Sequence, residues 1–227
     1  SFSISIVLFL SFVVAIAFTN HTLTPLRPWT ADISIISPQN TCSIDNSILE
    51  KLEKNPIVNA AYGRMFSYDV PTTVNDDSVT LDIISYEQKQ FDWAKDYLLQ
   101  GSIKVVQNEV NTGLIVYSPE NNIEVGDTVN CRIGEKSTEI QIAGILSDCP
   151  FNTTSNGILI CSENTFQKIT GQNEYTVIDI QLDKNATDTD VNALHQMIGN
   201  DFTFSDERMG NESTRGIYYC MCLFLYG

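Results

Sequence analysis

Two stretches without a charged residue frame the sequence. Residues 1–18 contain fourteen apolar residues and four serines, and residues 216–227 are rich in aromatic and aliphatic side chains. An 18-residue helix rises about 27 Å, close to the hydrocarbon thickness of a bilayer, which is about 30 Å. We therefore expect residues 1–18 to form a truncated transmembrane helix and residues 211–227 to begin a second one, also truncated. Residues 19–210 are expected to form a domain between them, on the extracytoplasmic side of the cell membrane.

Each end has a second interpretation. A secretory signal peptide is also apolar, but a basic leader normally precedes it and a small-residue cleavage site follows it. Residues 1–18 show neither pattern. The C-terminal stretch could instead be a buried strand or helix of the domain itself. Tyr218 and Tyr219 favour the membrane interpretation, because tyrosine is enriched at membrane–water interfaces.

The net charge of −15 excludes one class of partner. Binding to phosphates needs cationic side chains, so we expect no nucleic acid partner. A segment poor in Lys and Arg between two membrane spans also fits the outer side of the membrane, because short cytoplasmic loops are the basic ones. An acidic surface can attract cationic peptides, and otherwise it contributes solubility.

The cysteines and histidines do not predict a metal site. The sequence has six cysteines without a Cys-x-x-Cys pair, and its two histidines are His21 and His195. Zinc sites usually need closely spaced pairs of such ligands. Cys220 and Cys222 lie in the expected second membrane segment. The other four can form up to two disulfides or stay free thiols, and the sequence leaves both open: Cys42, Cys131, Cys149 and Cys161.

Short strands and helices alternate in the interior of the chain. Apolar and polar residues alternate with a period of two in some segments, and apolar runs or extended patterns mark others. The expected strands cover residues 33–35, 58–68, 79–83, 113–117, 129–133, 139–145, 157–161, 178–182 and 202–204. Helical spacing and capping residues predict four helices between them. The first helix is expected between Ser43 and Pro56, and the second between Ser85 and Leu98, with Ser85 and Gln88 in a capping box. The third is expected between Ser162 and Gly171, and the fourth between Thr187 and Gly199. This mixture predicts a single α+β domain with a mixed sheet.

A β-hairpin is the clearest supersecondary signal. Residues 129–133 and 139–145 alternate on either side of a turn at residues 134–136. Residues 134–138 read Gly-Glu-Lys-Ser-Thr, which is close to the end of a phosphate-binding loop. Such a loop needs Gly directly before Lys and a helix after it, whereas Glu135 separates the two here. We therefore predict a hairpin turn and no nucleotide cofactor.

No group of residues predicts catalysis. The sequence has no Gly-x-Ser-x-Gly nucleophile motif, and His195 lies on an expected helix. Asp76 and Asp77 fall in a polar loop, and Asp188 and Asp190 fall at a helix start, where they interact favourably with the helix dipole. We assign no catalytic, cofactor-binding or metal-binding residue and expect the chain not to be an enzyme.

Several short stretches resemble FtsX-like, MacB-type ABC transporter permeases. They occur in the same order at residues 125–129 (Val-Gly-Asp-Thr-Val), 139–146, 156–160 and 162–166. Residues 204–208 and 223–227 resemble the entry to the second membrane helix of such permeases from Gram-positive bacteria. The ordered set between two membrane segments carries the resemblance, which covers most of residues 100–227.

The resemblance implies a porter-like α+β core with an inserted β-hairpin or small second lobe. It also implies a cytoplasmic ABC ATPase subunit that hydrolyses ATP, and a second permease subunit that completes a homodimer or heterodimer. The domain would couple hydrolysis to export, extraction or signalling outside the membrane. A peptide, lipid or lipoprotein would be the substrate.

Two other classes of function stay open at this point. One is a membrane-anchored extracellular receptor or adhesion domain without transport. The other is a secreted hydrolase with a signal peptide, which would be cleaved near Ala17 and would carry paired carboxylates in a cleft.

Overall fold

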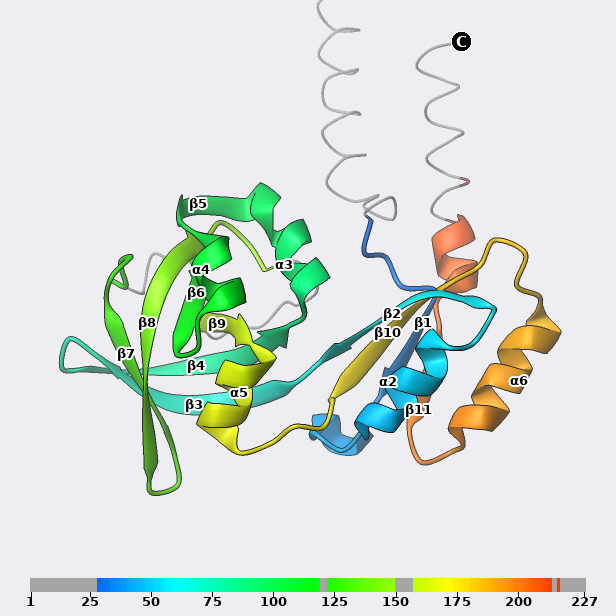
Figure 1. Ribbon diagram of the computed structural model, residues 1–227, viewed down its shortest axis with the longest axis horizontal. Helices are drawn as coiled ribbons and strands as arrows, with labels where there is room; N and C mark the ends of the chain where they lie inside the picture. The colour runs from blue at the N-terminus through cyan, green and yellow to red at the C-terminus, as the bar shows by residue number, and fades with distance from the viewer. Residues whose placement is uncertain (1–27, 119–121, 150–156, 214–215, 217–227) are drawn as a thin grey trace, which may run out of the picture.

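The computed structural model describes residues 28–118, 122–149, 157–213 and 216 (Figure 1). The transmembrane segment expected at residues 1–18 lies outside these ranges, as does most of the one expected at residues 211–227. Within these ranges, no helix is both long and apolar enough to cross a membrane.

The described chain folds into two lobes, which lie side by side along the long axis of the molecule (Figure 1). The smaller lobe is a four-stranded antiparallel sheet with the order β11-β1-β10-β2. Its helices contribute Leu52 and Leu194 to the same hydrophobic core as Ile33 and Ile180 of the sheet. The elements are β1 Ile33–Ile36, η1 Pro38–Asn40, α2 Asn46–Glu53, β2 Val58–Arg64, β10 Val177–Leu182, α6 Asp188–Ile198 and β11 Thr203–Asp206.

The larger lobe is a seven-stranded mixed sheet that closes on itself. Its order is β5-β8-β6-β9-β4-β3-β7, and β7 also pairs with β8. All strands except β5 therefore form a closed barrel, in which β4 and β9 run parallel, as do β6 and β8. The strands are β3 Phe66–Val74, β4 Asp77–Tyr86, β5 Leu98–Gly101, β6 Thr112–Val116, β7 Thr128–Ile133, β8 Lys136–Leu146 and β9 Gly157–Ser162. The helices are α3 Gln88–Ala94, η2 Lys95–Tyr97, α4 Ile103–Asn108 and α5 Glu163–Thr170.

The barrel wall is buried on both faces at the C-terminal part of β4. Successive side chains of a strand point to opposite faces, so β4 places Leu81 and Ile83 in one hydrophobic core and Ile84 and Tyr86 in another. The second core also contains Phe91 of α3, because α3 and α4 pack on the outside of the barrel. All residues from Leu81 to Tyr86 are therefore buried, although Asp82 and Ser85 interrupt the apolar residues of this segment.

The structure confirms the predicted α+β class, the mixed sheet and the hairpin. β7 and β8 pair antiparallel around a turn at Gly134, which has the positive φ of 60° that favours glycine. Two helix caps are also confirmed. Ser162 accepts a hydrogen bond from the backbone of Thr165 at the start of α5, and Thr187 forms a capping box at the start of α6.

Two predicted helix starts are wrong, and both errors come from contacts made across the fold. The first helix begins after Asp45 rather than after Ser43, because Ile44 forms an isolated β-bridge with Tyr175. The capping box of α3 is formed by Glu87 and Gln90.

In place of the expected Ser85–Gln88 box, Ser85 lies in β4, where its hydroxyl accepts a hydrogen bond from the backbone N–H of Met65. Leu98 is not in this helix either, since it begins β5. β5, α4 and the part of β3 after Tyr68 were not predicted.

Candidate functional site at the junction of the two lobes

The chain crosses between the lobes twice, from β2 to β3 through Met65 and from α5 back to β10. Backbone hydrogen bonds tie the crossings together. Ser85 N–H donates to the Met65 carbonyl at 3.0 Å, and Thr176 N–H donates to the Arg64 carbonyl at 2.8 Å. The Thr176 hydroxyl also accepts from Phe66 N–H at 3.0 Å. Within the described ranges, these two segments carry the chain from one lobe to the other, so contacts at this junction help to set how the lobes sit relative to each other.

A buried ion pair lies at the first crossing. Arg64 and Asp179 approach to 2.6 Å, and their side chains are only 7% and 12% exposed. Ser34 donates a second hydrogen bond to Asp179 at 2.7 Å. The guanidinium of Arg64 lies 5.9 Å from the centre of the Phe66 ring, which belongs to the barrel. The pair therefore connects three strands of the small sheet with the first residue of the larger lobe.

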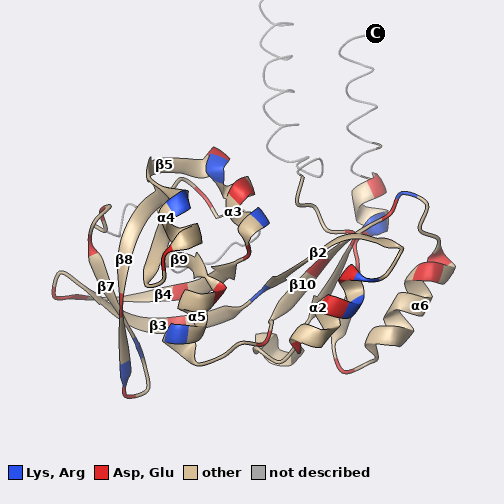
Figure 2. Cartoon of the chain, viewed as in Figure 1, with Lys and Arg blue, Asp and Glu red and all other residues tan. Residues whose placement is uncertain are grey.

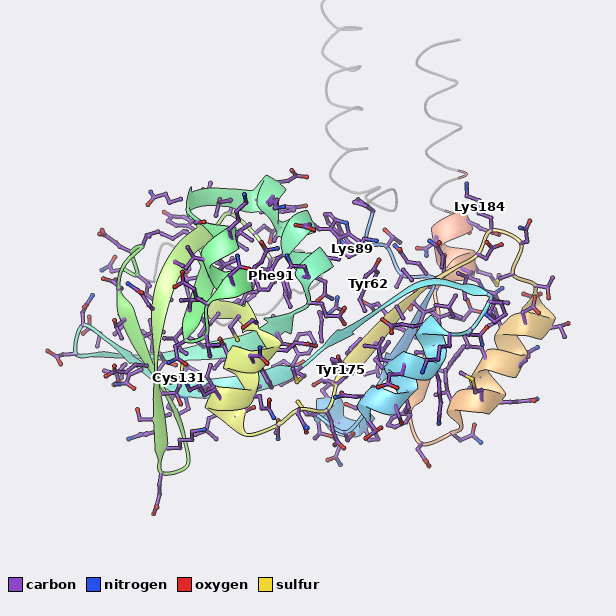
Figure 3. All side chains as sticks on the ribbon, viewed as in Figure 1. Tyr62, Lys89, Phe91, Cys131, Tyr175 and Lys184 are labelled. Carbon is purple, nitrogen blue, oxygen red and sulfur yellow. The ribbon has the colours of Figure 1, made fainter. Side chains whose placement is uncertain are left out.

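Acidic side chains meet at the same junction. Glu87, at the end of β4, accepts a hydrogen bond from the backbone N–H of Gly63 in β2 at 2.5 Å. The Tyr175 ring packs directly on Gly63, and a Cβ added to Gly63 would lie 2.4 Å from a carbon of that ring. The Tyr175 hydroxyl donates to the carboxylate of Glu163. Figure 3 shows Tyr62, Lys89 and Tyr175 in the region between the lobes.

Burial changes the protonation of these acids. It raises the pKa of Glu87 to about 7, and repulsion from Glu163 and Glu53 acts in the same direction. The Gly63 N–H and the Arg64 guanidinium lower that pKa, but by less. Burial also raises the pKa of Glu163, while the hydrogen bond from Tyr175 lowers it.

An aromatic cluster links the start of the described chain to both lobes. We define it as Trp29, Tyr62, Trp93 and Tyr97. The Trp29 ring lies 6.2 Å from Trp93 and 6.1 Å from Tyr97, and Tyr62 lies 4.9 Å from Trp93. The ammonium of Lys89 is 5.6 Å from the centre of the Tyr62 ring, within cation–π range. Trp29 precedes β1, Tyr62 is in the small sheet, and the other two rings belong to the larger lobe.

The described chain enters and leaves the small lobe at one pole (Figure 1). β1 and β11 pair side by side, and the Glu207 N–H donates to the Asp32 carbonyl at 2.9 Å. The Asn211 side chain donates to the Ala31 carbonyl at 2.9 Å. Arg208 forms ion pairs with Asp206 at 2.6 Å and with Asp188 at 3.0 Å. The entering and leaving segments are therefore bonded to each other, and the leaving segment is also bonded to α6.

A cavity of about 860 Å³ opens beside this pole. Figure 2 colours the positions of acidic residues, which occur in both lobes. Several acidic residues line this cavity together with Lys184 and Arg208. Its acidic lining residues are Asp32, Asp183, Asp188, Asp206 and Glu212. Across the described ranges, no cluster of three His, Cys, Asp or Glu residues has the arrangement of a metal site.

The residues considered from the sequence do not meet in one site. His195 stacks on Phe204 at 4.3 Å, and Asp190 accepts from the backbone of Thr187 in the capping box. Asp76 lies in the turn between β3 and β4. The four cysteines whose state was open are free thiols: Cys42, Cys131, Cys149 and Cys161.

Sequence reasoning missed Arg64, Asp179, Glu87 and Glu163. Arg64 and Asp179 are charged residues within strand-forming segments, and this is the one feature of the sequence that marks them as unusual. Their separation in the sequence gives no indication that they pair with each other.

Comparison with known proteins identifies the architecture. Neither a protein-family model nor a curated protein matches the sequence. Among solved structures, the periplasmic region of MacB from Actinobacillus actinomycetemcomitans matches with a TM-score of 0.59 and 17% identity, over 85% of this chain and 98% of that one. The extracellular domain of the ABC-type transporter YknZ from Gram-positive bacteria matches with a TM-score of 0.51 and 10% identity, over 72% and 87%.

A domain of a permease protein from Porphyromonas gingivalis matches with a TM-score of 0.50 and 13% identity, over 78% of this chain and 88% of that one. These structures are the periplasmic region of MacB, the extracellular domain of an ABC-type transporter and a domain of a permease, and their shared fold confirms the resemblance found in the sequence. The chain has the fold of the extracytoplasmic domains of ABC transporter permeases such as MacB and YknZ.

Proposed function

We propose that this chain is the extracytoplasmic domain of an FtsX-like ABC transporter permease. It couples ATP hydrolysis by a cytoplasmic partner ATPase to export, extraction or signalling outside the membrane. The observation that carries the proposal is the shared fold, which spans nearly the whole periplasmic region of MacB. A second permease subunit and a peptide, lipid or lipoprotein substrate complete the proposed assembly.

The contacts at the entry pole support a mechanical role for the small lobe. Asn211 and Glu207 bond the leaving segment to Ala31 and Asp32 of the entering segment. A displacement of either segment therefore moves β11, an edge strand of the small sheet, and its neighbour β1 together. In this proposal the small lobe receives motion from the membrane helices of the permease.

The aromatic cluster offers a second route for the same motion. Trp29 on the entering segment contacts Trp93 and Tyr97 of the larger lobe directly, without passing through the small sheet. The barrel can therefore follow the entering segment even if the junction bends. We assign the barrel the outward role of engaging the substrate or a partner protein, and we assign no chemical step to any residue.

The test is ATP-dependent coupling in the complete permease. The full-length protein would be co-expressed with candidate ABC ATPases from the same organism and purified in nanodiscs. We expect a stable complex in which Trp29→Ala reduces ATP-driven transport or extraction severalfold while ATP hydrolysis continues. Tyr117→Ala is the matched control, because Tyr117 is an aromatic residue of the larger lobe that is 60% exposed. Failure of the chain to form a complex with the ATPase would contradict the proposal and favour a receptor or adhesion domain.

A further inference from the structure

Three glutamates, drawn from both lobes, lie within electrostatic range of one buried tyrosine. Glu87 follows β4, and Glu163 is the first residue of α5, so both belong to the larger lobe. Glu53 is the last residue of α2 in the small lobe. Tyr175 lies on the segment that returns to the small lobe and is only 7% exposed. All three carboxylates act electrostatically on its hydroxyl.

One of these glutamates holds the two lobes together. β2 is an edge strand of the small sheet, paired only with β10 within that sheet. The carboxylate of Glu87 accepts from the N–H of Gly63 in this edge strand. The ring of Tyr175 closes over Gly63 from another side, leaving no room for a side chain. The contact is therefore made by close backbone approach and one carboxylate.

The electrostatic balance at this contact is unfavourable to negative charge. Glu163 is half-buried, and its Oε1 is buried without a hydrogen-bond partner among the described residues. The charged groups that act on Glu87 are Glu163 and Glu53, which oppose its ionisation, and Arg64, which favours it. Arg64 is already held 2.6 Å from Asp179, so much of its charge is compensated.

We propose that the junction is a proton-operated latch, closed when Glu87 is protonated and loosened when Glu87 ionises beside Glu163. A neutral carboxyl keeps an oxygen that accepts from the Gly63 N–H and avoids the cost of a buried, repelled charge. Because burial raises the pKa of Glu87 to about 7, the change falls in the neutral range. The latch makes the relative position of the lobes depend on the pH of the surrounding medium, whether or not the protein is a transporter.

Intrinsic fluorescence can test the latch directly. The chain has two tryptophans, and both Trp29 and Trp93 belong to the aromatic cluster that spans the lobes. We would record tryptophan emission of the full chain in detergent micelles between pH 5 and pH 9. The expected result is one sigmoidal change with its midpoint near neutral pH. The variant Glu87→Gln should show the low-pH emission throughout, because it keeps the acceptor oxygen and cannot ionise.

Glu53→Gln is the matched control, since it removes an exposed charge of the same cluster without touching the Gly63 bond. It should keep the transition, with a midpoint shifted to lower pH. A flat wild-type titration, or an unchanged transition in Glu87→Gln, would overturn the latch.

A second measurement needs no variant. Hydrogen exchange of the peptide containing residues 58–64, corrected for the intrinsic effect of pH, should accelerate at least tenfold above neutral pH. Unchanged protection across this range would equally reject the proposal.

Discussion

The Arg64–Asp179 pair provides a sharp test of how the junction is stabilised. Asp179→Asn keeps the size of the side chain and one acceptor oxygen, whereas the carboxylate accepts from Ser34 through Oδ1 and meets Arg64 through Oδ2. It removes the negative charge opposite a guanidinium that is 7% exposed, and it replaces one of the two acceptor oxygens by an NH2 group. The variant therefore leaves a buried cation without its counter-ion.

The expected cost follows from that burial. Removing one partner of a buried ion pair typically costs about 3–5 kcal/mol, because the remaining charge is desolvated and uncompensated. We expect the lower end of this range, about 3 kcal/mol, since the asparagine still offers an acceptor. The double variant Arg64→Met with Asp179→Leu removes both desolvation penalties. It should lie within about 1 kcal/mol of the wild type or exceed it in stability.

Urea unfolding of the full chain, followed by far-UV circular dichroism, measures these differences. Glu50→Gln is a suitable control, because the Lys54–Glu50 pair is 78% and 67% exposed and contributes little in water. If Asp179→Asn loses no more stability than Glu50→Gln, the pair is effectively solvated and the reasoning is wrong. A double variant that is less stable than Asp179→Asn would also refute it.

Four further outcomes are expected. Thr187→Ala should lower the free energy of unfolding by about 1 kcal/mol through loss of the α6 capping box, as thermal unfolding would measure, and an unchanged midpoint would contradict this. Cys131 and Cys161 should resist alkylation in the folded chain, because burial raises the pKa of both thiols, that of Cys131 to about 11. Mass spectrometry that finds either thiol labelled before denaturation would contradict this. Residues 134–138 form the turn of a hairpin and the start of β8, so calorimetry should detect no saturable binding of ATP at micromolar affinity. A measurable isotherm would defeat this prediction. Because the folded state binds the Glu87 proton more tightly, the free energy of unfolding of the wild type should fall by about 3 kcal/mol relative to Glu87→Gln as pH rises from 4.5, the ordinary pKa of this group, to 7. Urea titrations that give parallel stability curves for the two proteins would disprove this.

Local features of the fold were predictable from the sequence. The hairpin of β7 and β8 and the caps of α5 and α6 depend on residues within one turn or one strand of each other. A strand with one buried face shows a period of two, and a capping side chain acts on a backbone group only two or three residues away. Such interactions are encoded in the order of residues alone.

The two helix starts were predicted wrongly because a residue near each of them forms a hydrogen bond with a distant segment of the chain. Ser43 and Ser85 both have the chemistry of a helix cap, but Ile44 pairs with Tyr175, and Ser85 bonds to Met65. Closure of the barrel could not be predicted from local sequence either, because β7 must pair with the distant strand β3 as well as with its hairpin partner β8.

By itself, the sequence determined the acidic net charge, the uncharged ends, the mixed α+β class and the absence of a phosphate-loop pattern. Only the tertiary structure decided which of the many acids matter. It brings Glu87 from one lobe to Gly63 of the other, 24 residues away, and places Asp179 against Arg64. The protonation of a carboxyl group depends on its burial and on charges within a few ångströms, and these distances are set by the folded chain rather than by position in the sequence.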